Sequence, residues 1–124
     1  MEPAISPDGK WVACLTTESI QPKIAVIPFS GGEAVKTFSV PEGANLGQGV
    51  HIHWTPDSRA IGYVNTVKGV SNIWTQPLAG GPPKQASQFT SGDIFNFAWS
   101  PKGDLALARG AQSSDVVLIR NFEQ

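Results

Sequence analysis

The chain has 124 residues, 40% of them hydrophobic and 15% charged, with a formal net charge of −1 at pH 7, values typical of a single globular domain. Nine Lys and Arg stand against ten Asp and Glu without runs of either sign, which excludes the basic surface that a nucleic acid or an anionic membrane requires. No stretch approaches the roughly 20 apolar residues of a membrane span, and no charged start before an apolar run indicates a signal peptide.

The residue types favour short strands joined by turns. Thirteen Gly and ten Pro accompany a single Met, and no segment keeps apolar residues at helical spacing for three turns. We therefore expect an all-β fold without helices. The single cysteine, Cys14, cannot form an internal disulfide and stands in an apolar run, so we expect a buried and inert thiol.

Three segments along the chain are versions of one pattern. They read AISPDGKWVACL from residue 4, HWTPDSRAIGYV from residue 53 and AWSPKGDLALA from residue 98. Their prolines, Pro7, Pro56 and Pro101, are 49 and then 45 residues apart, which is the spacing of repeats built from a few antiparallel strands. In each copy a short apolar strand precedes a Ser or Thr, the proline and a polar pair.

The residues around each proline predict a hairpin turn. Proline presets φ at the second turn position, aspartate can bond to its own backbone, and glycine adopts the left-handed conformation that reverses the chain. Copy two has Ser58 in place of the glycine, and copy three has Lys102 in place of the aspartate. The residues assigned to these turns are Pro7, Asp8, Gly9, Pro56, Asp57, Pro101 and Gly103.

The strands after the turns also align, provided that the third turn is one residue shorter. The matched sets are Val12, Ile61 and Leu105, then Ala13, Gly62 and Ala106, then Cys14, Tyr63 and Leu107. A small residue between two larger apolar ones predicts a second strand packed closely on both faces. Third strands follow around residues 24–26, 73–75 and 116–118, and the polar segments 34–38 and 84–89 predict outer fourth strands.

These segments predict eleven strands in three antiparallel sheets of four, four and three strands, over residues 1–48, 49–92 and 93–124. Radially arranged sheets at this spacing are typical of a β-propeller, so we interpret the chain as a propeller fragment of about three blades. A β-sandwich is the alternative all-β fold, but it gives no reason for a turn pattern to recur about every 45 residues.

The repeats quoted above, together with IAVIPFSGG, IWTQPLAGG and FAWSPKGDLALARG, resemble those of TolB-type β-propellers, distant relatives of the WD-repeat propellers. The segment ARGAQSSDVVLIRNF is similar to the end of propellers attached to bacterial signalling proteins, such as membrane-anchored serine/threonine kinases and winged-helix regulators. The resemblance implies the last three blades of a longer bacterial protein, extracytoplasmic in the kinase case and otherwise cytoplasmic. It also implies that residues 115–122 form an exposed edge, because a segment from the N-terminal side completes the final blade of full-length relatives.

An open arc of three blades would expose an apolar face at each end. A ring of 4 to 8 blades buries every such face, and two copies of three blades make six. We therefore predict a homodimer in which the two chains pack head to tail and close a six-bladed ring about a two-fold axis.

The segment HIHWTPD at residues 51–57 places two histidines on one face of a strand, where they could hold a metal ion. Zinc takes three or four ligands, and no cysteine or carboxylate is tied to His51 and His53 by its spacing, so we expect neither a metal nor a cofactor. The alignment instead sets His51 opposite Glu2 and Asn96, a polar position in all three copies that we assign to the channel wall. His53 replaces an alanine, so we expect a packed histidine bonded to a backbone carbonyl and ask whether it fills a gap between blades.

No pattern in the sequence indicates catalysis. The nucleophile motif Gly-x-Ser-x-Gly is absent, and the carboxylates show no paired spacing. Trp54 and Trp99 share one repeat position and should lie in the core, whereas Trp11 and Trp74 break the pattern and could be surface contacts. We predict a non-catalytic interaction or sensor module whose channel or loops bind a protein, peptide or small ligand in the parent protein. The alternative is the propeller of a serine peptidase or hydrolase whose catalytic part is absent.

Overall fold

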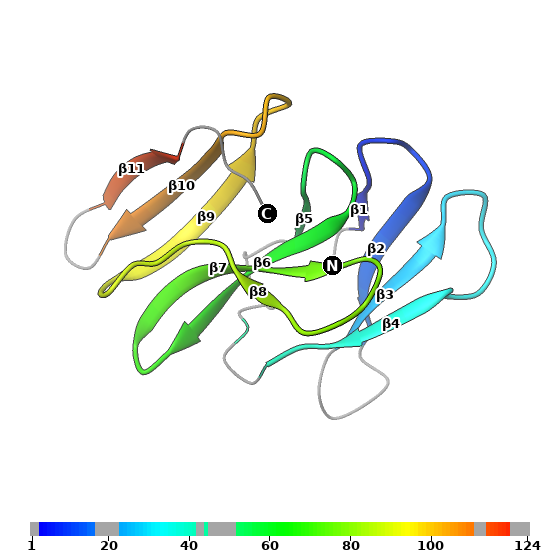
Figure 1. Cartoon of the computed structure of the whole chain (residues 1–124), viewed down its shortest axis with the longest axis horizontal. Helices are drawn as coiled ribbons and strands as arrows, with labels where there is room; N and C mark the ends of the chain where they lie inside the picture. The colour runs from blue at the N-terminus through cyan, green and yellow to red at the C-terminus, as the bar shows by residue number, and fades with distance from the viewer. Residues whose placement is uncertain (1–2, 17–22, 42–43, 45–51, 111–113, 120–124) are drawn as a thin grey trace.

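The computed structural model describes residues 3–16, 23–41, 44, 52–110 and 114–119, with the backbone alone for 114–118. These residues form eleven strands and no helix. Figure 1 shows the strands as three sheets that stand side by side in an arc, and we call each sheet a blade. Within the described ranges, nothing helical is long and apolar enough to cross a membrane.

Blades 1 and 2 have four antiparallel strands each, in chain order, and blade 3 has three. Blade 1 consists of β1 (Ala4–Ile5), β2 (Trp11–Thr16), β3 (Lys23–Pro28) and β4 (Lys36–Ser39). Blade 2 consists of β5 (His53–Trp54), β6 (Ala60–Val67), β7 (Val70–Pro77) and β8 (Lys84–Gln85). Blade 3 consists of β9 (Asp93–Trp99), β10 (Leu105–Gly110) and β11 (Ser114–Ile119), with β11 at its edge. The predicted all-β propeller fragment of four, four and three strands is confirmed.

The outer strand of blade 2 is shorter than the predicted segment 84–89. After Gln85 the regular ladder ends, although the N–H groups of Ala86 and Ser87 still donate to the Ile73 carbonyl, and the side chain of Asn72 binds the residues that follow. Its Oδ1 accepts a hydrogen bond from the Ser87 hydroxyl at 2.9 Å and from the Phe89 backbone N–H at 2.6 Å. Side-chain bonds thus add to the irregular backbone bonds at this edge.

Pairing between the first two strands of each blade follows the alignment of the repeats. Ile5 pairs with Val12, Trp54 with Ile61, and Trp99 with Leu105. The next pairs inward are Ala4 with Ala13, His53 with Gly62, and Ala98 with Ala106. The three blades are therefore equivalent residue by residue in this region.

The three predicted turns are present, and the third is one residue shorter. The N–H groups of Gly9, Ser58 and Gly103 each donate to the carbonyl three residues earlier, and all three residues have positive φ, at 74°, 62° and 94°. The third turn closes with a bond from the Ser100 N–H to the Asp104 carbonyl, four residues on, whereas the corresponding bond spans five residues in the first two turns.

Aspartate has the same role in the first two turns. The Asp8 carboxylate accepts from the Ser6 hydroxyl at 2.6 Å and from the Lys10 N–H at 3.0 Å. The bond from Ser6, followed by the backbone bond from Lys10, lowers the pKa of Asp8 below its ordinary value. Asp57 accepts from the hydroxyl two residues earlier and the N–H two residues later in the same way.

Because side chains alternate along a strand, each blade has two faces. We call the face that bears Ile5, Trp54 or Trp99 the leading face of its blade, and the face that bears Ala13, Gly62 or Ala106 the trailing face.

The cores lie between blades. Between blades 1 and 2, the trailing face of blade 1 contributes Ala13, Ile24 and Val26, and the leading face of blade 2 contributes Trp54, Ile61 and Tyr63. Between blades 2 and 3, the buried residues are Val64, Ile73, Ile94, Phe97, Leu105 and Leu107. In both contacts the leading face of one blade packs on the trailing face of the blade before it.

Candidate functional site

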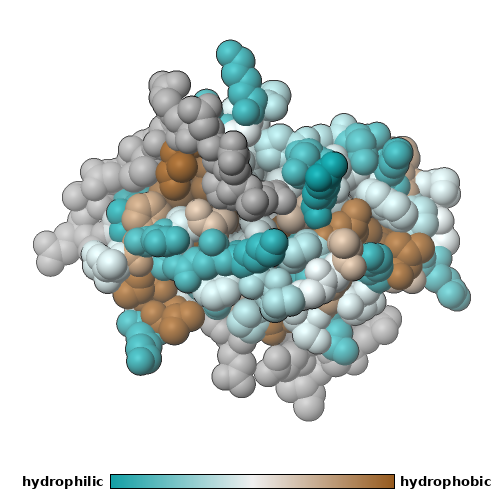
Figure 2. All heavy atoms as spheres, viewed as in Figure 1, coloured by the Kyte–Doolittle hydropathy of each residue, from teal (hydrophilic) through white to brown (hydrophobic). Residues whose placement is uncertain are grey.

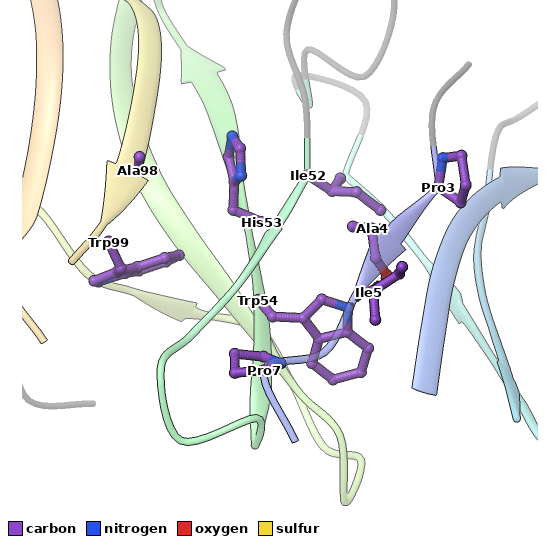
Figure 3. A pocket seen from close by; sticks show the side chains of 9 residues that line it. All are labelled: Pro3, Ala4, Ile5, Pro7, Ile52, His53, Trp54, Ala98 and Trp99. Carbon is purple, nitrogen blue, oxygen red and sulfur yellow. Dashed lines mark hydrogen bonds between the residues drawn. The ribbon is translucent and has the colours of Figure 1, made fainter. Parts of the chain in front are cut away.

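A cavity of about 340 Å³ opens where the first strands of the three blades converge. Its lining is apolar and aromatic, with one imidazole. Figure 3 shows Trp54 projecting from β5 toward β1, beside Ile5 and Pro7, while Trp99 approaches from β9. The lining residues are Pro3, Ala4, Ile5, Pro7, Ile52, His53, Trp54, Ala98 and Trp99. The described side chains suit an apolar or aromatic group, the backbone groups exposed among them add hydrogen-bonding surface, and no carboxylate belongs to the described part of the lining.

His53 lies between blades 2 and 3, which answers the question that its place in the repeat raises. Its ring meets the ring of Phe97 edge to face, with 4.8 Å between centroids and an angle of 84°. Phe97 in turn meets Trp99 edge to face at 5.6 Å. His53 therefore belongs to an aromatic contact that joins two blades.

Trp54 and Trp99 each anchor their blade to the one before it. The Trp54 Nε1–H donates to the Ala4 carbonyl of blade 1 at 2.9 Å, and the side chain is only 6% exposed. Trp99 lies over Gly62 of blade 2, where an added Cβ would stand 2.4 Å from Cη2 of the indole. Trp54 meets the expectation of core packing, and Trp99 is half-buried against the core.

The structure describes most, but not all, of the predicted site residues. The seven assigned turn residues lie in the turns as predicted, and Asn96 is an exposed residue of β9 whose side chain accepts from the Phe97 N–H at 2.8 Å. Glu2 and His51 lie outside the described residues. The assignment of Glu2, His51 and Asn96 to a channel wall stays a prediction. Among the described residues, no three His, Cys, Asp or Glu side chains gather as metal ligands would.

Two side-chain environments differ from expectation. Cys14 is half-buried rather than buried, because it lies on the leading face of blade 1, on which no described blade packs. Trp11 and Trp74 are partly buried against the core between blades 1 and 2 and are not free surface contacts.

Ser58 has a role that the repeat pattern did not reveal. Its Oγ accepts a hydrogen bond of 3.0 Å from the Asp8 backbone N–H, and so joins the turn of blade 2 to the turn of blade 1. In the sequence, Ser58 is a departure from glycine that weakens the turn signal. Its inter-blade partner is 50 residues away, so no local pattern could have identified it.

The leading face of blade 1 is more open than the same positions in blades 2 and 3, where Trp54, Ile61 and Leu105 are buried and Trp99 is half-buried. Ile5 is 56% exposed, whereas its equivalent Trp54 is 6% exposed. Val12 is half-buried, whereas its equivalents Ile61 and Leu105 have no exposed surface. Phe29, which follows β3, is 58% exposed.

Phe29 corresponds to Leu78 of blade 2. Each residue donates its N–H to the backbone carbonyl of the residue just before the second strand of its blade, and Leu78 packs against the core between blades 1 and 2. Figure 2 shows apolar side chains exposed at the right end of the molecule, where blade 1 lies, as well as at the left.

The trailing face of blade 3 is open as well. Ala106 is half-buried, while its equivalent in blade 1, Ala13, has no exposed surface. Ala98 is exposed beside it. A shallow hollow of about 220 Å³ lies here, lined by Asn96, Phe97, Ala98, Ala106, Leu107 and Ala108. The arc thus ends in two apolar faces that have the residue pattern of a blade contact but lack a covering blade among the described residues.

No family model matches the sequence, and no curated protein matches it. Among solved structures, the chain is similar to TolB from Acinetobacter baumannii, with 21% identity and a TM-score of 0.70 over 98% of this chain and 30% of that one. TolB from Agrobacterium tumefaciens shares 21% identity, with a TM-score of 0.69 over 94% and 41% of the two chains. A prolyl endopeptidase shares 23% identity, with a TM-score of 0.70 over 99% and 20%. The chain thus spans less than half the length of each neighbour, and its fold is that of three consecutive blades of a TolB-type β-propeller.

Proposed function

We propose that this chain is a non-catalytic β-propeller binding module, which completes its propeller by packing head to tail with a second copy. One observation carries the proposal. Residues at the two ends of the arc are open at positions whose equivalents are buried in the contacts between blades, as with Ile5 at 56% exposure and Trp54 at 6%. Burying such faces contributes roughly 25 cal/mol per Å² of apolar area.

The number of blades supports closure by two copies. Two arcs of three blades make six, within the 4 to 8 of known propellers, whereas three arcs make nine. In a pair, the leading face of each blade 1 would meet the trailing face of the other chain's blade 3. The two contacts are identical and related by a two-fold axis, so the assembly closes and does not grow into a fibre.

The cavity at the first strands supports a binding role. In a closed ring it would lie at the wall of the central channel, where the other chain would contribute a second, identical cavity. Its lining of Trp, Pro and Ile side chains with one histidine favours an apolar or aromatic portion of a peptide or small ligand. Among the described residues of that lining, His53 adds an imidazole that can donate or accept a hydrogen bond, which suits the polar end of such a ligand.

The mass of the protein in solution tests the proposal. Sedimentation equilibrium at micromolar concentration should give twice the chain mass of 13.2 kDa, that is 26.4 kDa. A mass of one chain throughout the micromolar range would refute closure by a second copy.

The prolyl endopeptidase neighbour favours a second candidate, the propeller of a peptidase whose catalytic part lies elsewhere. In that case further blades of the same polypeptide would cover both end faces, and the 124-residue chain would have no built interface with itself. A single-chain mass, together with recovery of a closed propeller when neighbouring blades of the parent are added, would favour this candidate over the first.

A further inference from the structure

The two contacts between blades follow one rule of shape. Between blades 2 and 3, a large side chain at the end of the first strand lies against a small residue in the second strand of the preceding blade, and the core between blades 1 and 2 has a large and a small residue at the same two positions. Trp99 covers Gly62 so closely that a Cβ there would stand 2.4 Å from the ring. Trp54 shares its core with Ala13, which has no exposed surface. A large residue on the leading face thus fits a small residue on the trailing face.

At the two ends of the arc, the residues at these two positions have no partner blade among the described residues. Ile5 occupies the position of Trp54 and Trp99, because it pairs with Val12 as they pair with Ile61 and Leu105. Ala106 occupies the position of Ala13 and Gly62 at the other end, and it lines the open hollow on blade 3. The Ile5 side chain is small enough for the hollow, because isoleucine is smaller than tryptophan and the residue that it would meet, Ala106, has only a methyl side chain.

We propose a register for the closing contact, and this inference rests on the proposed function. Ile5 of one copy packs against Ala106 of the other, in the hollow beside Ala98. Phe29 covers the rim of this contact, as Leu78 covers the contact between blades 1 and 2. The register is continuous with the two contacts inside the chain. The residues that meet in this register are uncharged, so their burial leaves no charge without a partner. They are Ile5, Val12 and Phe29 on one side and Ala98, Ala106 and Asn96 on the other.

Two substitutions test the register from opposite sides. Ile5→Asp places a charge in the hollow, and Ala106→Trp fills the hollow from within. Each should raise the dissociation constant of the pair roughly a hundredfold, because each removes a central apolar contact from both interfaces. Val67→Asp is the matched control, since Val67 is 52% exposed but lies beside the β6–β7 turn of the middle blade, away from both end faces. It should leave the mass unchanged.

Mixing the two variants separates a head-to-tail contact from other pairings. A mixed pair has one contact with both substitutions and one contact with the natural Ile5 and Ala106. The mixture should therefore associate more tightly than either variant alone, by roughly tenfold or more. A wild-type dimer that Ala106→Trp leaves intact, or a mixture that gains nothing, overturns the register while self-association stands. A monomeric wild-type protein overturns the proposed function itself.

A gain-of-function variant keeps the test independent of folding defects. Ile5→Trp introduces the residue that blades 2 and 3 have at this position. In blade 2, the indole of Trp54 donates a hydrogen bond to a backbone carbonyl of the preceding blade. It should tighten the pair by roughly tenfold. A variant that folds but binds no tighter, or more weakly, would contradict the seat against Ala106.

Cys14 provides a readout in the unmodified protein. It is the single cysteine and lies half-buried on the leading face of blade 1, so the partner copy should cover it. Alkylation of Cys14 should slow as protein concentration rises through the dissociation constant, and it should not slow for Ile5→Asp. An alkylation rate independent of concentration in a protein shown to dimerise would place the contact elsewhere.

Discussion

At Gly62, two blades approach so closely that no side chain fits. An added Cβ would lie 2.4 Å and 2.6 Å from two atoms of the Trp99 indole, and 3.3 Å from the Phe97 ring. An aromatic ring is rigid and cannot deform to make room, so the whole ring or the backbone would have to move. The glycine at this position of the repeat is therefore required by the tryptophan above it.

Gly62→Ala should lower the free energy of unfolding by about 1–3 kcal/mol through overpacking, measured by urea denaturation. The same substitution in a Trp99→Leu background should cost less, because the clashing ring is absent. A double-mutant cycle gives the coupling. Equal costs in both backgrounds would show that the ring is not the cause.

Tyr63 is fully buried, and its hydroxyl has no hydrogen-bond partner among the described residues. Burial disfavours the phenolate and raises the pKa of Tyr63 to about 12. Tyr63→Phe removes a buried polar atom, so at pH 7 the unfolding free energy should stay the same or rise by up to about 1 kcal/mol. A loss larger than that in urea denaturation would contradict an unpartnered hydroxyl.

The same residue predicts a dependence on pH. The folded pKa is raised above the unfolded value of 10.0, so the neutral form stabilises the fold fully below pH 10, and this contribution falls as the pH rises toward 12. Wild-type stability should therefore decrease between pH 10 and 12 relative to Tyr63→Phe. Because the chain has one tyrosine, phenolate absorbance reports its titration directly.

Among the elements, the turns show how one position can serve two purposes. Ser58 takes the left-handed conformation that glycine takes in the other two blades, with φ of 62°. A non-glycine residue is disfavoured there by about 1–2 kcal/mol. The hydrogen bond from the Asp8 N–H to its Oγ offsets that cost by joining two blades.

Ser58→Ala keeps the disfavoured backbone and loses the bond, so it should lower the unfolding free energy by about 1–2 kcal/mol. Ser58→Gly also loses the bond but relieves the backbone, so it should be close to neutral. Thermal denaturation of the two variants checks the difference. If glycine destabilises as much as alanine, the backbone at this turn carries no strain.

Much of the architecture could be predicted from the sequence, because it depends on local patterns repeated three times. Proline and glycine set the turns, alternation sets the strands, and the repeat fixes the pairing of the first two strands, including the shorter third turn. The alignment also singles out His53, whose equivalents are alanines, but its aromatic partner across the blades, Phe97, could not be read from the repeat.

Other features depend on contacts between distant residues and have no local signal. Asn72 holds the segment after the outer strand of blade 2 by accepting a bond from the Phe89 N–H, 17 residues on. Arg109 packs 3.6 Å above the centre of the Phe89 ring and donates to the Ser91 carbonyl. The half-buried state of Cys14 likewise has no local signal, because it follows from the lack of a covering blade among the described residues. The cavity of the candidate site combines residues of three blades, so its shape follows from their packing and from no single motif.

At the scale of the whole molecule, the arc has two cores between blades, and no blade among the described residues covers its two apolar ends. If a second copy covers the ends, folding and association are linked by mass action, and the melting temperature should rise with protein concentration. Differential scanning calorimetry over a hundredfold dilution checks this. Ile5→Asp should melt at a temperature independent of concentration, and so should the wild type if it does not self-associate.

The contacts of a closed ring would differ in strength because of one residue. Tryptophans anchor blade 2 to blade 1 and blade 3 to blade 2, and the Trp54 indole also donates a hydrogen bond across its contact. Where the chains meet, Ile5 offers less area and no donor. The ring would therefore have two weak contacts on opposite sides, where the chains meet. On dilution it would dissociate at these contacts, while each chain kept its fold. Two such halves could exchange partners without unfolding, so the ring would form and open reversibly.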